Sequence, residues 1–90
     1  MSTSITEILK ERGARYGKFK DHAGISQSLK ELMVTQAGWV RLEHDQREAL
    51  EMIAHKIARI LNGDPQYADS WKDIGGYADL VANRLQGVEL

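Results

Sequence analysis

The sequence predicts an all-α protein with four helices in a single domain spanning residues 1–90. Apolar residues recur with helical spacing in several segments, and no segment alternates with the two-residue period of a strand for long enough to form a sheet. Turns rich in glycine or proline separate the periodic segments. Ninety residues with 42% apolar content suit one core.

The first helix is expected over residues 5–13. Ile5, Ile8 and Leu9 share one face, and Ser4 and Glu7 have capping-box spacing. Gly13 and Gly17 then predict a loop that reaches residue 23 and carries a cluster of basic and aromatic residues: Arg15, Tyr16, Lys18, Lys20 and His22.

The second helix is expected over residues 24–37, because Ile25, Leu29, Leu32 and Met33 form one stripe before Gly38. The third is expected over residues 45–61, where Asp45 and Glu48 have capping-box spacing. Its apolar stripe consists of Leu50, Ile53, Ile57, Ile60 and Leu61.

The fourth helix is expected over residues 69–86, with Trp71, Ile74, Ala78, Val81 and Leu85 on its stripe. Gly63 suits the end of the third helix, and Pro65 biases Asp64 away from helical geometry. The short turn between the third and fourth helices predicts an antiparallel hairpin.

Composition narrows the classes of function. The chain has no cysteine and no apolar stretch near the roughly 20 residues that span a bilayer, which favours an intracellular protein without membrane attachment. A net charge of −1 disfavours DNA binding. The small core, with Met33, Trp39 and Val40 near a helix break, predicts a homo-oligomer.

Four carboxylates form the predicted metal site. Glu48 and Glu51 lie on the third helix, and Asp69 and Asp73 are i, i+4 neighbours on the fourth. Oxygen ligands of this kind hold Mg²⁺ and let it engage a polyphosphate. The expected ligand-binding residues flank this cleft or lie on the basic loop: Arg15, Tyr16, Lys18, Lys56, Arg59 and Tyr77.

A structural interpretation of the same residues stays open. Glu51, His55 and Arg59 have the spacing of ordinary surface pairs. Asp69 has the chemistry of a helix N-cap, and Asp73 has Lys56 or Arg59 as potential ion-pair partners. The three histidines lack metal-site spacing, so no zinc is expected.

Gly75 and Gly76 are adjacent inside the fourth helix, where each costs roughly 1 kcal/mol relative to alanine. We interpret them as a point of close helix packing against a bulky residue such as Trp39 or Trp71. Room for a ligand, or a kink, is the alternative.

Two blocks of the sequence resemble a known group of proteins. The segments "ILKERGARYGKFKDHAGISQSLK" and "DQREALEMIAHKIARILNGDPQYADSWKDIGGYADLV" are similar to a family of short bacteriophage and prophage proteins. This resemblance implies a phage-encoded protein in the cytoplasm of an infected bacterium. It implies no particular activity.

A second resemblance is to the MazG-like all-α nucleoside triphosphate pyrophosphohydrolases, whose signature is E-E-x-x-E on one helix and E-x-x-D on a later one. Glu48 and Glu51 match the E-x-x-E part, and Asp73 matches the final aspartate. Arg47 and Ser70 stand where further carboxylates are expected, so hydrolysis is in doubt and enzymatic activity stays open.

The sequence therefore favours a nucleotide-binding protein without efficient turnover. One alternative is a phage anti-defence protein that sequesters a signalling nucleotide or blocks a host protein. Another is a structural or regulatory interaction module.

Overall fold

The computed structural model describes residues 4–88 and contains no strand within them, which confirms the all-α fold. No helix in that range is long and apolar enough to cross a membrane. The elements are α1 (Ile5–Tyr16), α2 (Phe19–Val34), the 3₁₀ helix η1 (Ala37–Arg41), α3 (His44–Asn62) and α4 (Ala68–Leu85).

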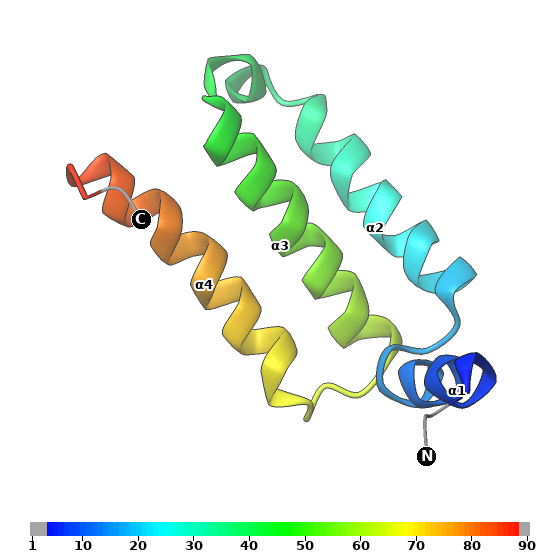
Figure 1. Cartoon of the computed structure of the whole chain (residues 1–90). Helices are drawn as coiled ribbons and strands as arrows, with labels where there is room; N and C mark the ends of the chain where they lie inside the picture. The colour runs from blue at the N-terminus through cyan, green and yellow to red at the C-terminus, as the bar shows by residue number, and fades with distance from the viewer. Residues whose placement is uncertain (1–3, 89–90) are drawn as a thin grey trace.

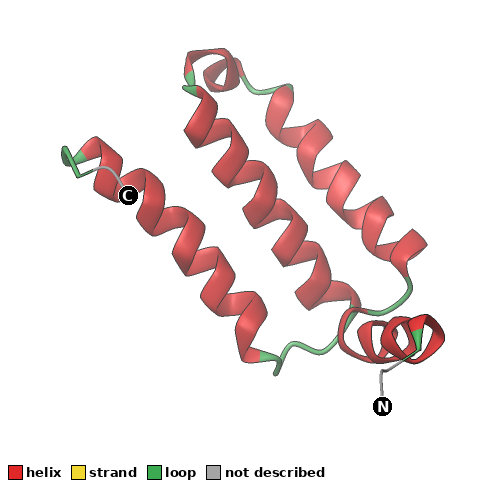
Figure 2. Ribbon diagram, in the orientation of Figure 1, coloured by secondary structure: helices red, strands yellow, loops and turns green. Residues whose placement is uncertain are grey.

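Three helices form a layer with α3 in the middle (Figures 1 and 2). Helix α3 contacts α2 on one side and α4 on the other, and α1 lies across the end where α3 finishes and α2 starts. The predicted hairpin is confirmed. The turn after Asn62 joins α3 to α4, and the two helices run antiparallel and pack against each other.

Helix α1 begins with the predicted capping box. The Glu7 amide donates to Ser4 Oγ at 3.1 Å, and the Ser4 amide donates to the Glu7 carboxylate at 3.4 Å. The helix continues three residues beyond its predicted end, through Gly13 to Tyr16. Gly17 ends it with a positive φ of 77°, a conformation that glycine adopts without strain.

The predicted loop over residues 14–23 is wrong. These residues form the end of α1, a short turn and the first turns of α2, which begins at Phe19. The inward positions at the start of α2 are His22 and Ser26, and both are buried. Because these inward residues are polar, the helical period of this segment does not appear in a search for apolar spacing.

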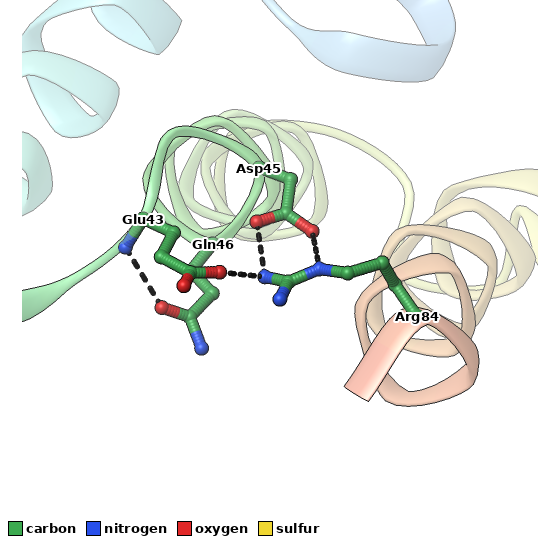
Figure 3. A network of polar contacts seen from close by, with 4 residues as sticks. All are labelled: Glu43, Asp45, Gln46 and Arg84. Carbon is green, nitrogen blue, oxygen red and sulfur yellow. Dashed lines mark hydrogen bonds and ion pairs between the residues drawn. The ribbon is translucent and has the colours of Figure 1, made fainter. Parts of the chain in front are cut away.

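The predicted cap of α3 is also corrected. The N-cap is Glu43, whose amide donates to Gln46 Oε1 at 2.9 Å, and Asp45 lies in the first turn (Figure 3). Asp45 instead accepts from Arg84, with Nε to Oδ2 at 2.7 Å and a second guanidinium contact to Oδ1 at 2.5 Å. This fork joins the start of α3 to the end of α4.

The core between these helices consists of small residues. Ala49, Ala54 and Ala58 are the buried apolar side chains among the described residues, and no large side chain there is fully buried. The Cα radius of gyration is 15.4 Å, compared with about 12 Å for a compact domain of this length. The layer is therefore open and has little interior of its own.

The close packing predicted at Gly75 and Gly76 is not found. A Cβ atom placed on either glycine meets no atom within 4 Å, and both residues are exposed. The helix is continuous through them, so there is no break. Within the described residues of one chain, no contact compensates for their cost to the helix.

Candidate functional site

The turn between α1 and α2 is fixed by the end of α3. Asn62 Nδ2 donates to the carbonyl oxygens of Tyr16 at 2.8 Å and Lys18 at 3.0 Å, and the Asp64 amide donates to the Arg15 carbonyl at 2.6 Å. The Asn62 side chain thus gives a donor to the Tyr16 carbonyl, which α1 leaves without a helical partner. It adds a second donor to the Lys18 carbonyl, which also accepts from the His22 amide at 3.0 Å.

Two glycines permit this contact. A Cβ atom on Gly17 would overlap Asn62, and a Cβ atom on Gly63 would overlap the backbone of Arg15 and Tyr16. The backbones of the two segments therefore approach more closely than any side chain would allow. This approach sets where the end of α1 lies against α3.

Arginine and tyrosine side chains stack beside this turn. The Arg59 guanidinium lies 4.3 Å from the centre of the Tyr16 ring, and Arg15 lies 4.7 Å from the centre of the Tyr67 ring. The two tyrosine rings meet edge to face with centroids 6.1 Å apart. These contacts hold the α1 end and the α3–α4 turn together.

A histidine pair joins α2 to α3 near the turn. Nε2 of His22 and Nδ1 of His55 are 3.2 Å apart, and the two rings are nearly perpendicular. One nitrogen must donate and the other accept, so the pair requires at least one neutral ring. His22 is only 4% exposed, and its Nδ1 has no hydrogen-bond partner of normal geometry among the described residues.

Both histidines are poor proton acceptors in this environment. Burial, with the neighbouring His22 and Arg59 acting in the same direction, lowers the pKa of His55 to about 4. Burial also lowers the pKa of His22, together with the charges of Arg59 and Lys30, while the Ala58 backbone favours its protonation. Both rings are therefore neutral at pH 7 and offer hydrogen bonds instead of charge.

These groups surround a cavity of about 530 Å³ between α1, α2 and the last turns of α3. Its described lining contains three permanent cations, two neutral histidines, two aromatic rings and no carboxylate. The lining residues are Leu9, Arg12, Gly13, Tyr16, Gly17, Lys18, Phe19, His22, His55 and Arg59. We call this cavity the basic pocket.

A family model described as a domain of unknown function, DUF6378, matches residues 1–85. The chain belongs to the DUF6378 family. No curated protein and no solved structure matches it.

Three of the predicted ligand-binding residues of this DUF6378 chain lie together in the basic pocket: Tyr16, Lys18 and Arg59. The other three lie elsewhere. Arg15 is held by Tyr67 and by Glu11, whose carboxylate is 2.7 Å away. Lys56 is buried and pairs with Asp73, and Tyr77 lies farther along the α3–α4 seam beside Glu48.

The structure does not bring the four predicted metal ligands together. Within residues 4–88, no group of three or more histidine or carboxylate side chains is placed to hold a metal ion. Asp73 pairs with Lys56 at 3.0 Å, as the structural interpretation expected. Asp69 accepts from the Tyr67 hydroxyl at 3.0 Å and is not the N-cap of α4, a position that Tyr67 occupies.

The charged, histidine and aromatic pocket residues of the DUF6378 chain that were absent from the predicted site are Arg12, Phe19, His22 and His55. Arg12 lies one helical turn before Tyr16, a spacing that would have shown their shared face had α1 been predicted to continue past Gly13. The contact between His22 and His55 joins residues 33 positions apart and has no local signal in the sequence.

Proposed function

We propose that the protein binds a small phosphorylated ligand of the nucleotide class in the basic pocket, without efficient turnover. The observation that supports this most strongly is the lining itself, which combines Arg12, Lys18 and Arg59 with aromatic rings and has no described carboxylate. Its volume falls within the roughly 300–1,000 Å³ typical of small-molecule sites.

The phosphate end of such a ligand fits the side of the pocket where α2 starts. Lys18 is the N-cap of α2 and makes no side-chain capping bond, so the first amides of the helix have no partner from the cap. These amides and the positive end of the helix dipole attract an anion, and the three cations add charge. Arginine also binds phosphate through two parallel hydrogen bonds.

The base of a nucleotide fits the aromatic part of the lining. Phe19 is 79% exposed at the edge of the pocket, so its ring is accessible for stacking. Tyr16 is already covered on one side by Arg59. Stacking on such rings contributes about 1–3 kcal/mol per base and tolerates different bases.

Binding without turnover is the form of activity that the lining supports. A pyrophosphohydrolase of the MazG-like type needs carboxylates to hold magnesium and activate water. Glu48, Glu51, Asp69 and Asp73 are not among the residues that line the basic pocket. Magnesium binding by these four residues stays a prediction and would be separate from the proposed site.

A phage origin and sequestration of a host signalling nucleotide belong to the same proposal and rest on the sequence resemblance. Sequestration would use the same pocket and the same chemistry, with tight stoichiometric binding and no product. A protein that acts only by contacting a host partner would bind no nucleotide in this pocket.

The test is equilibrium dialysis with a panel of linear and cyclic nucleotides, followed by chromatography of the ligand before and after the protein is denatured. At least one nucleotide should bind stoichiometrically and be recovered unchanged. The double variant Arg12→Gln/Lys18→Gln should weaken this binding at least about tenfold, since each lost charge-assisted contact contributes about 1.5–3 kcal/mol.

The matched control is Lys10→Gln/Lys72→Gln, which removes the same charge from exposed positions outside the pocket. It should bind like the wild type. Equal weakening in both variants, or no binding of any nucleotide at millimolar concentration, would refute the site. Recovery of a cleaved nucleotide would instead show turnover.

A further inference from the structure

The face of the layer opposite the basic pocket is apolar and has no partner in the described chain. It contains large side chains from all three helices of the layer. We call it the apolar face and define it by Leu32 of α2, Leu50, Ile57 and Leu61 of α3, and Trp71 and Leu85 of α4.

Helical register places these residues on one side. Leu50, Ile57 and Leu61 lie about half a turn around α3 from Arg59, which lines the basic pocket. On α4, Trp71 and Leu85 are two heptads apart and lie well away from Asp73, which faces Lys56. Helix α3 runs antiparallel to both neighbours (Figure 1). With these directions, helical register puts the three stripes on the same face of the layer.

The exposure of this face is large. Leu61 is 68% exposed, Leu32 62%, Leu85 59% and Trp71 56%. The chain has an accessible surface of 6643 Å², whereas a compact monomer of its mass has about 5,300 Å². The excess is greater than the roughly 800 Å² that each partner buries in a standard protein interface.

We infer that a second copy of this chain covers the apolar face, in a homodimer related by a two-fold axis. The large apolar side chains of the layer are half-buried or exposed, and only three alanines are buried apolar residues in the described chain. One chain therefore buries little apolar surface for a 90-residue domain, and another surface is needed to cover the rest. The same face of a second copy meets this need, since it is apolar along the same length. In a two-fold dimer each copy uses this face, so neither face stays uncovered.

The small residues of α4 fit this arrangement. Gly75, Ala78 and Ala82 lie between Trp71 and Leu85 on the same stripe, and all three are exposed. A helix surface without side-chain bulk lets a partner backbone approach closely. Gly75, which has no packing role within one chain, would therefore have one between two chains.

This dimer leaves both basic pockets open. The pocket and the apolar face are on opposite sides of α3, so each protomer would present its pocket on the outer surface. Pairing does not depend on the proposed ligand, because it follows from the exposed apolar surface alone.

Sedimentation velocity of the wild type and of Leu32→Glu/Leu85→Glu tests the inference. The wild type should sediment at twice the protomer mass of 10.1 kDa. The variant places two charges in the interface at positions that are exposed within one protomer, so it should sediment at the protomer mass. Dimer formation should also shift the emission of Trp71 to shorter wavelength as the protein concentration rises, measured in a Trp39→Phe background because the chain has two tryptophans.

The control is Val34→Glu/Leu80→Glu. Val34 and Leu80 are exposed apolar residues of the same two helices, directed away from the apolar face, and this variant should stay dimeric. Loss of helical circular dichroism in the first variant, with the control folded and dimeric, also supports the inference, because folding is then coupled to pairing. A monomeric wild type at about 100 µM, or a dimer lost only in the control, overturns it.

Discussion

His22 and His55 make the stability of the protein sensitive to mildly acidic pH, because burial lowers the pKa of each. The 3.2 Å contact between Nε2 and Nδ1 needs one donor and one acceptor. If both rings carried a second proton, two N–H groups would face each other beside the positive charge of Arg59. Protonation of the pair therefore opposes the contact between α2 and α3.

We predict that the melting temperature falls as the pH is lowered from 6.5 to 4. The pKa of His55 is about 4 in the folded protein and 6.5 when unperturbed, so the unfolded chain takes up protons first and is favoured across this window. His22, whose pKa is also lowered, acts in the same direction. Above pH 6.5 both histidines are mainly neutral in the folded and in the unfolded protein, so their titration no longer lowers its stability.

Thermal melts followed by circular dichroism in buffers from pH 4 to 8 check this prediction, with His55→Gln as the comparison. The variant lacks one titrating ring, so its melting temperature should change less over the window. The Asp45 carboxyl, whose pKa is lowered by Arg84, titrates below 3.8 and so affects a more acidic range. A wild-type melting temperature that is constant or rises as the pH falls would contradict the prediction.

Asn62 is the residue on which the geometry of the turn between α1 and α2 depends. We predict that Asn62→Ala lowers the free energy of unfolding by about 1–3 kcal/mol, because it leaves the half-buried Tyr16 carbonyl without its donor and removes the second donor to the Lys18 carbonyl. Urea denaturation measures the change. Asn83→Ala is the control, since that half-buried asparagine of α4 makes no side-chain hydrogen bond with a described residue.

At the scale of the elements, the sequence was most informative where apolar period and helix ends agree. The third and fourth helices were predicted within a few residues, because their stripes are apolar and the turn contains Gly63 and Pro65. The start of α2 was missed because its inward residues, His22 and Ser26, are polar and buried. Apolar spacing cannot reveal a helix that packs through polar side chains.

The candidate site was predictable only in part, because it depends on which faces of different helices meet. Tyr16, Lys18 and Arg59 were selected for their chemistry, and the structure places them around one cavity. Lys56 and Asp73 were expected either in a site or in an ion pair, and the structure has the ion pair. The choice between these outcomes depends on how α4 is rotated against α3, which the spacing of charges within each helix does not determine.

The two glycines of α4 differ in their place on the helix, and this allows a further prediction. Gly76 lies outside the apolar stripe, and a Cβ atom there meets nothing within 4 Å. Gly76→Ala should therefore raise the free energy of unfolding by about 0.5–1 kcal/mol through helix propensity alone. Chemical denaturation measures the gain, and a loss of stability would show that the position has a packing role.

At the scale of the whole molecule, the layer separates two surfaces with different chemistry. One side holds the basic pocket, where cations, neutral histidines and aromatic rings gather at the end of α3. The other side is the apolar face. The thickness of a single helical layer explains why neither surface is buried within one chain. In the inferred dimer the second copy covers the apolar face and contributes no residue to the pocket.

The most direct test of the proposed site is an amide NMR titration of the uniformly ¹⁵N-labelled protein with the nucleotide that binds best in the dialysis panel. We expect the largest shifts in the first turn of α2, from Lys18 to His22, and around His55 and Arg59 on α3. Shifts concentrated instead around Glu48 and Tyr77 on the α3–α4 seam, or no shifts at millimolar nucleotide, would contradict the proposed binding in the basic pocket.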